Sequence, residues 1–230
     1  IVAFSAFVCF FPQLIAGPIV RHNELIPQFS VVFSRQTNFE CLTRGLVLFI
    51  LGLSKKVFVA DELGTLVDPI FLSAGTSAVD FGSAWQATLG FTLQLYFDFS
   101  SYSDMALGLA GLFGLKLPIN FDRPYVSLTV REFWRRWHIT LSRFFTDYVY
   151  IPLGGNRNKY RIYLSIFLTM ILSGIWHGAG WTFVLWGAFH GMAICINRIW
   201  QKTGLRLPDI AAWALTFFTW TILIVFFRAD

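Results

Sequence analysis

The chain has 230 residues, of which 56% are hydrophobic and only 13% are charged, and its mean hydropathy is +0.60. Because a soluble domain carries about 25% charged residues, this composition excludes an ordinary soluble protein and favours a membrane protein. Lys and Arg outnumber Asp and Glu by 18 to 13, and in a membrane protein such an excess marks cytoplasmic loops rather than nucleic-acid binding.

The first segment is apolar, and residues 1–16 are expected to be the end of a membrane-spanning helix. Two prolines and a glycine between residues 12 and 18 break this helix and predict a re-entrant or interfacial turn. A polar loop is predicted from there to about residue 40. Because the chain begins and ends in apolar runs and has no initiator Met, we expect an internal part of a longer chain, with a single membrane core domain over residues 1–230.

Residues 41–60 predict the next apolar helix, and residues 61–80 predict a polar connection. Residues 83–115 then form a long apolar region, with room for one spanning helix and a second, shorter segment. This region contains Asp98 and Asp104, and an ionisable group inside a spanning segment is usually functional or paired.

Asp98 has hydroxyl-bearing neighbours. Asp98 and Tyr102 are four residues apart and share a face if the helix is continuous. We therefore expect Asp98 to accept hydrogen bonds from Ser101 and Tyr102 and to hold two helices together. We favour this structural role over a catalytic one.

Residues 116–161 are rich in Lys and Arg, and within them residues 130–150 predict one amphipathic helix. Its apolar side chains recur at helical spacing: Phe133, Trp134, Trp137, Leu141, Phe144 and Phe145. Its cationic side is formed by Arg131, Arg135, Arg136 and Arg143. Such a helix lies in the membrane interface or packs beneath the membrane domain, and His138 directly follows Trp137 within it.

The most informative stretch is SGIWHGAGWTFVLWGAFHG, residues 173–191. Apart from its two histidines, His177 and His190, no acidic or basic residue falls between residues 162 and 196. Two apolar segments, 162–177 and 181–197, meet at a Gly-Ala-Gly turn, so His177 lies at the break. Interrupted backbone at membrane depth is tolerated only beside protein or a cavity. The sequence therefore predicts a cavity at His177, whereas a buried histidine bonded to a neighbouring carbonyl remains the alternative for both imidazoles.

A second basic loop follows at residues 198–206, and residues 209–227 predict the last apolar helix. The positive-inside rule places both basic regions in the cytoplasm. Sixteen helical residues rise about 24 Å, less than a hydrocarbon core of about 30 Å, so we expect His177 in the outer half of the membrane near a vestibule. Three scattered cysteines predict neither a disulfide framework nor a metal site: Cys9, Cys41 and Cys195.

Four long motifs, in this order, resemble those of the membrane-bound O-acyltransferases: FFPQLIAGPIVRHNELIPQF, YFDFSSYSDMALGLAGLFGLKLPINFDRPY, REFWRRWHITLSRFFTDYVYIPLGG and SGIWHGAGWTFVLWGAFHG. Within that family they are most similar to members that O-acetylate alginate, peptidoglycan and cellulose, and less similar to the D-alanyl transfer protein of teichoic acid synthesis. The resemblance implies an all-α, polytopic membrane helix bundle with a cytoplasmic-side amphipathic helix and re-entrant segments, of which this chain is part of the core.

The resemblance also implies site residues. The family's essential histidine lies in a WHG motif, which here gives His177, and a second family position lies in the RWH motif, which gives His138. No catalytic role carries over to His190. The implied donor is acetyl-CoA or a similar acyl thioester, with no bound cofactor. The implied acceptor is an extracytoplasmic polysaccharide, reached directly or through a periplasmic acetyltransferase partner, in the bacterial inner membrane.

Acyl transfer from a thioester to a hydroxyl needs a base, oxyanion donors and exclusion of water. A neutral His177 in an apolar cavity suits the first and third needs. Trp176, Trp181 and the N–H groups of the glycine turn are candidate oxyanion donors. Arg135 and Arg136 could bind donor phosphates, although arginines on a helix face more often meet lipid headgroups. The rival hypothesis is a transporter or channel that uses the intramembrane Asp and His residues.

Overall fold

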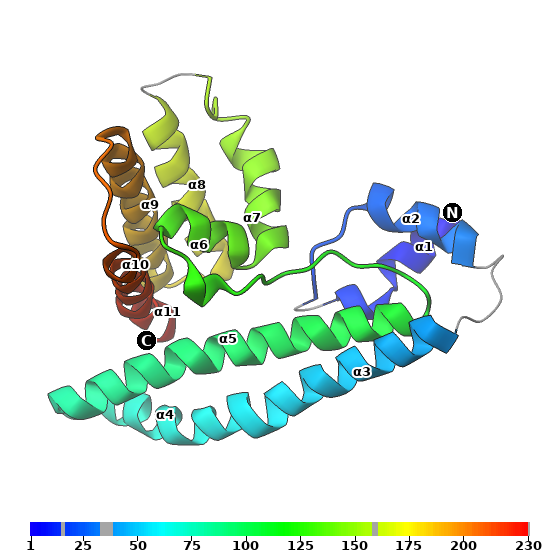
Figure 1. Ribbon diagram of the computed structural model, residues 1–230, viewed down its shortest axis with the longest axis horizontal. Helices are drawn as coiled ribbons and strands as arrows, with labels where there is room; N and C mark the ends of the chain where they lie inside the picture. The colour runs from blue at the N-terminus through cyan, green and yellow to red at the C-terminus, as the bar shows by residue number, and fades with distance from the viewer. Residues whose placement is uncertain (15–16, 33–38, 158–160, 230) are drawn as a thin grey trace. The chain divides into compact units, whose positions relative to one another are not determined.

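The computed structural model describes residues 1–14, 17–32, 39–157 and 161–229, and every regular element in these ranges is a helix (Figure 1). The all-α prediction is therefore confirmed. The chain divides into two compact units. The first unit is Ile1–Leu66 with Leu93–Asn120, and the second unit is Val67–Thr92 with Phe121–Asp230.

The described residues of the first half of the chain form five helices and two short helical turns. They are α1 (Val2–Val8), a 3₁₀ turn (Phe11–Gln13), α2 (His22–Val32), α3 (Phe39–Lys55), a π-helical turn (Lys56–Ala60), α4 (Asp61–Ala74) and α5 (Phe81–Leu112). In the first unit α2 packs on the end of α5, because Leu25 and Phe29 are buried with Ala110 and Leu115. The expected turn at 12–18 lies partly outside the described residues.

Three predictions for this region are wrong. Residues 22–32 are helical rather than a polar loop, since Leu25, Phe29 and Val32 recur at helical spacing and pack in the core. Residues 61–74 are helical rather than a connection, because apolar side chains repeat at helical spacing through Pro69 and acidic residues begin the first turn. Residues 81–112 form one helix of 32 residues rather than two segments.

Asp98 holds two helical segments together, as expected, but its side chain does so through a partner other than Ser101 and Tyr102. Its carboxylate forms an ion pair with Lys56 Nζ at 2.7 Å, joining α5 to the π-helical turn after α3. The Ser101 hydroxyl donates to the backbone carbonyl of Asp98 at 2.6 Å, and the Tyr102 hydroxyl donates to the carbonyl of Leu14 at 3.2 Å. Asp104 pairs in the same way with Lys55, so the carboxylates of α5 are balanced by lysines of the neighbouring helix.

Asp98→Asn should therefore leave folding nearly intact. Lys56 keeps its second ion pair, with Asp61 at 2.6 Å, and half-exposed pairs contribute only about 0–1 kcal/mol. Asp98→Leu, which cannot accept a hydrogen bond, should lower the amount of folded protein in membranes, with Asp61→Asn as the matched control. An Asp98→Asn protein that accumulates normally but has lost all activity would assign Asp98 a catalytic role.

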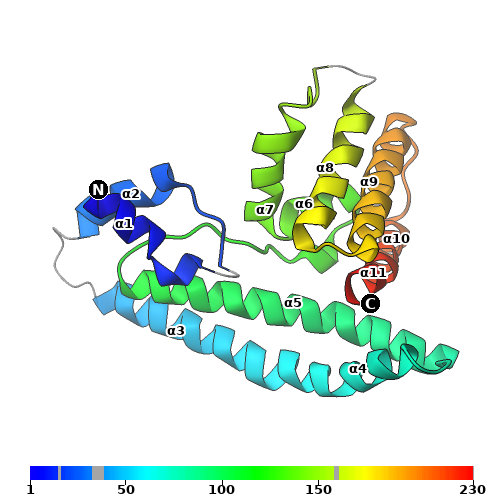
Figure 2. The ribbon, with the colours of Figure 1, turned by 180° about the vertical axis from the view of Figure 1, so that it is seen from behind.

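The second unit begins with part of α4 and α5 and then forms a bundle. Its further helices are a 3₁₀ turn (Pro124–Val126), α6 (Val130–Arg136), α7 (Ile139–Phe145), a π-helical turn (Thr146–Tyr150), α8 (Arg161–His177), α9 (Trp181–Lys202), α10 (Asp209–Leu223) and α11 (Val225–Arg228). The helices α8 and α9 run side by side in both views (Figures 1 and 2). The predicted break between them at the Gly-Ala-Gly turn is confirmed.

Close contact between α8 and α9 requires glycine. A Cβ at Gly174 would lie 2.1 Å from the carbonyl oxygen of Phe183, and one at Gly187 would lie 2.3 Å from that of Met170. Both obstacles are backbone atoms, which a side-chain rotation cannot move. Helices approach this closely where small residues face each other, as is common in membrane proteins.

The single amphipathic helix predicted for residues 130–150 is wrong. The helix stops at Arg136, and His138 adopts a left-handed conformation with φ 42° before α7 begins. In a continuous helix, Trp137 and His138 would point about 100° apart, so one face could not bury both. The break allows both side chains to be buried. It also frees the Arg136 carbonyl, which accepts a hydrogen bond from the Asp122 N–H at 3.0 Å.

One helical stretch among the described residues is long and apolar enough to cross a membrane by length and composition: Asp209–Arg228, 20 residues with a hydropathy of 2.1. The apolar helix α8 is shorter. The end of the chain bends at Ile224, where α10 gives way to α11, and this bend directs Phe227 toward α8 and α9.

Gly187→Ala tests the close approach of α8 and α9. Because the added methyl would overlap a backbone carbonyl, the substitution should destabilise the full-length protein by about 1–3 kcal/mol or more, seen as a lower thermal unfolding midpoint in detergent. Gly180→Ala in the same hairpin is the control, since its Cβ would meet only side-chain atoms, of Thr182 at 3.4 Å and of Phe183 at 3.7 Å. Equal midpoints for the two variants would contradict the packing described.

Candidate functional site

The second unit contains a buried aromatic cluster where α6 faces α9 and α10. The ring centroids of Phe133 and Trp220 are 4.3 Å apart, and those of Trp137 and Trp220 are 4.6 Å apart. The helix α6 is held in this position by its first turn: the Thr129 hydroxyl caps the N–H of Glu132 at 3.0 Å, and the Glu132 carboxylate accepts from the Leu128 N–H at 3.0 Å. This reciprocal capping fixes the end of α6 that precedes the aromatic side chains.

His177 is the last residue of α8, so its imidazole extends beyond the α8–α9 contact. Its ring lies edge-on to Trp186 of α9, with centroids 5.3 Å apart, and edge-on to Phe227 of α11 at 5.0 Å. The neighbouring Trp176 points outward and is more than half exposed. Three helices therefore meet at His177, and none of these contacts supplies it with a carboxylate.

His138 lies at the break before α7 and is only 6% exposed. Its ring stacks on Phe121 at 6.4 Å. Burial lowers the pKa of His138 to about 3, and the His177 imidazole lowers it further, because a charge on one ring would repel a charge on the other. His138 is therefore neutral at pH 7, and the two histidines lie within range of direct electrostatic interaction.

A cavity of about 450 Å³ lies between α6, α7, α8 and α9. Four arginines contribute to its lining: Arg131, Arg135, Arg143 and Arg198. Other parts of its wall are apolar, including Leu141, Phe145 and Met170. The cavity predicted at His177 is not lined by His177 or by His138. Its lining residue nearest to the histidine along α8 is Ser173, one helical turn before His177, so the cavity runs along α8 toward the histidine.

Three of the cavity's arginines lie close to one another: Arg131, Arg135 and Arg198. The pKa of Arg131 is lowered first by burial and then by the positive charges of Arg135 and Arg198. Among the described residues, no ion pair joins these three guanidinium groups to a carboxylate, and the buried Nε of Arg198 has no hydrogen-bond partner there. The pKa of Tyr150, beside them, is raised by burial. The cavity can therefore hold an anionic group.

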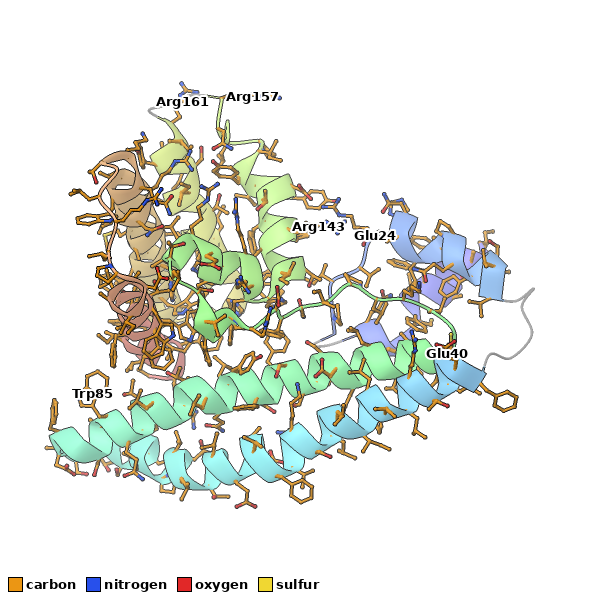
Figure 3. All side chains as sticks on the ribbon, in the orientation of Figure 1. Glu24, Glu40, Trp85, Arg143, Arg157 and Arg161 are labelled. Carbon is orange, nitrogen blue, oxygen red and sulfur yellow. The ribbon has the colours of Figure 1, made fainter. Side chains whose placement is uncertain are left out.

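Arg136 points elsewhere, although the sequence pairs it with Arg135. Its guanidinium forms ion pairs with Glu132 at 2.9 Å and with Asp122 at 3.6 Å, and it does not line the cavity. Two further basic residues, Arg157 and Arg161, lie near the start of α8, at the end remote from His177 (Figure 3).

Sequence reasoning missed several residues around the histidines. Trp186 and Phe227 contact His177 from other helices, and no local motif indicates that contact. The sequence places Arg198 in a basic loop, whereas it belongs to α9 and lines the cavity. The described residues contain no group of His, Cys, Asp and Glu suited to a metal ion.

His190 is almost completely buried, with 1% of its surface exposed. It lies on α9, four residues after Trp186, and three indole rings surround it. It does not line the arginine cavity.

The family model of membrane-bound O-acyltransferases matches residues 1–229. The chain is 48% identical to a peptidoglycan O-acetyltransferase of Helicobacter pylori over 98% of its length, and 44% identical to a probable alginate O-acetylase AlgI of Pseudomonas aeruginosa over its whole length. It covers 44% of each of these relatives. A teichoic acid D-alanyltransferase of Streptococcus thermophilus is 30% identical over 86% of the chain and 50% of the relative.

Proposed function

The chain belongs to the membrane-bound O-acyltransferase family, and we propose that it forms part of an enzyme that O-acetylates a polysaccharide outside the cytoplasm. An acetyl or other acyl group would move from a cytoplasmic thioester, acetyl-CoA or a similar donor, to an acceptor hydroxyl. The acceptor would be the polysaccharide itself or a periplasmic acetyltransferase partner. The relatives named for peptidoglycan and alginate acetylation support this substrate class.

The observation that carries the proposal is the cavity that joins arginines to the neighbourhood of His177. Its arginines and Tyr150 suit the phosphates of a donor, since guanidinium groups bind phosphate with two parallel hydrogen bonds. Its apolar wall suits the uncharged arm that carries the thioester. Because α9 runs antiparallel to α8, Arg198 lies near the start of α8 and Ser173 lies near His177.

In the proposed reaction His177 is the general base. The neutral imidazole takes the proton of the acceptor hydroxyl as the oxygen attacks the thioester carbonyl, and a C–O bond forms. The tetrahedral intermediate collapses with loss of the C–S bond, and the thiolate receives the proton from the imidazolium. Among the described residues, no serine or cysteine has the surroundings of an activated nucleophile, so transfer is direct. Packing around His177 by Trp186 and Phe227 limits the access of water.

His138 would position the donor, because it lies close to His177 and immediately follows the helix that carries Arg131 and Arg135. We assign Arg157, Arg161 and residues 198–206 to the cytoplasmic face of a bacterial inner membrane, because basic residues are concentrated there. The earlier part of 116–161 reaches the level of His177, since the ring of Phe145 lies 6.4 Å from that of Trp176. A cysteine placed at Asn156 should then react with a thiol reagent only after the inner face is made accessible, and labelling in intact cells would reverse this orientation.

The transporter alternative depends on four intramembrane groups: Asp98, Asp104, His177 and His190. Asp98 and Asp104 are each paired with a lysine, so neither needs a transported ion to balance its charge. In our proposal His177 is a base rather than an ion site, and the cavity that approaches it along α8 contains arginines, which repel cations.

His177→Ala in the full-length protein should lower acetyl transfer by about 10²–10⁴-fold, the usual contribution of a general base. His177→Gln should be similarly impaired, since Gln can position a hydroxyl but cannot take its proton. His138→Ala should mainly raise the apparent KM for the donor. Rates are compared at equal amounts of folded protein in membranes. Near-parental transfer by a well-folded His177→Ala protein would disprove the mechanism.

Arg135→Gln and Arg198→Gln should each raise the donor KM about 3- to 100-fold, the range for losing one partly exposed or buried charge-assisted hydrogen bond. Arg136→Gln is the matched control: it breaks the ion pairs with Glu132 and Asp122, so it should lower thermal stability and leave the donor KM unchanged. A larger KM change for Arg136→Gln than for the other two would place the donor phosphates outside the cavity.

A further inference from the structure

Four side chains bring their buried nitrogen atoms together inside the second unit without forming hydrogen bonds to one another. The His190 ring centroid lies 5.2 Å from that of Trp134, 4.9 Å from that of Trp186 and 5.3 Å from that of Trp220. Among the described residues, neither ring nitrogen of His190 has a hydrogen-bond partner, and the same holds for the three indole N–H groups. These four side chains are called the indole cage.

The cage has too many donors and too few acceptors. Each indole can only donate, and a neutral imidazole offers one donor and one acceptor. The roughly edge-on contact of His190 with Trp134 gives at most a weak N–H···π interaction. Each buried polar group left unsatisfied costs about 1–3 kcal/mol, so a cage of this kind needs a further molecule that supplies acceptors.

A small cavity adjoins the cage. It has a volume of about 10 Å³, and His190, Trp134 and Trp220 line it together with Thr216 and Thr219. A volume of about 10–15 Å³ is the least that holds one water, and a water also needs two to four polar partners. The Thr219 hydroxyl already donates to the Leu215 carbonyl at 2.7 Å, so its oxygen can accept from a water.

We infer that this cavity binds one internal water molecule, held between His190 and the indole N–H of Trp220. The water accepts from the indole and donates to the unprotonated imidazole nitrogen, which fixes the tautomer of His190. A larger ligand does not fit the volume. The described residues also offer no His, Cys, Asp or Glu cluster that would favour a metal ion instead.

This water would stabilise the surroundings of His177 without taking part in the reaction. Trp186 touches His190 on one side and His177 on the other, with centroid distances of 4.9 Å and 5.3 Å. His190 is therefore a structural member of the site, and its binding of water does not depend on the proposed acyl transfer.

The test measures magnetisation transfer from water to the Trp220 indole proton by NMR, in full-length protein labelled with ¹⁵N-tryptophan in lipid nanodiscs. Trp220→Phe assigns the signal. Trp220 is chosen because it is 2% exposed and lines only the small cavity, whereas Trp134 also lines the arginine cavity. Transfer at Trp220 is expected in the parent protein, and its absence there would overturn the inference without reference to any variant.

Two substitutions distinguish a water held by His190 from general penetration of water. His190→Phe fills the space but cannot hydrogen-bond, so the transfer at Trp220 should be lost. His190→Gln keeps a donor and an acceptor, so the transfer should be retained. Unchanged transfer in a folded His190→Phe protein, with its other indole signals in place, would contradict the assignment of His190 as the water's partner.

Discussion

The site depends on the close approach of α8 and α9 at Gly174 and Gly187. Backbone carbonyls occupy the space where side chains would begin, so the two helices meet without intervening side chains. This contact brings His177, at the end of α8, against Trp186 of α9. It also sets the antiparallel register that puts Arg198 near the start of α8. A change in the separation of these helices would alter both the arginine cavity and the base.

The aromatic cluster forms the interior of the second unit, and α6 packs its aromatic side chains against those of α9 and α10. Thr129 and Glu132 cap α6, Phe133 and Trp134 extend from it into the cluster, and the break at His138 turns the chain so that two consecutive side chains are buried. The same short segment therefore contributes arginines to the cavity, the Trp134 indole to the cage and a histidine to the neighbourhood of His177. The apolar and cationic residues that make this segment amphipathic in sequence are the ones that form these three contacts.

Sequence reasoning succeeded where local pattern decides the structure. The Gly-Ala-Gly interruption between two apolar runs predicted the α8–α9 hairpin. The roles that the WHG and RWH motifs imply for His177 and His138 stay predictions. Sequence reasoning failed where contacts between distant parts of the chain decide the structure. Burial of both Trp137 and His138 breaks a helix that periodicity alone would continue, and Phe227 reaches His177 only because the chain bends after α10. At 61–74, Pro69 obscured an otherwise regular apolar repeat.

The central claim is that the arginine cavity leads a thioester donor to His177. The most direct measurement is a cryo-EM structure of the full-length protein with an acetyl-CoA analogue whose thioester is replaced by an unreactive thioether. The account predicts that its phosphates contact Arg131 and Arg198 and that its sulfur lies beside His177. An analogue bound away from these arginines, or with its sulfur directed away from His177, would contradict the account.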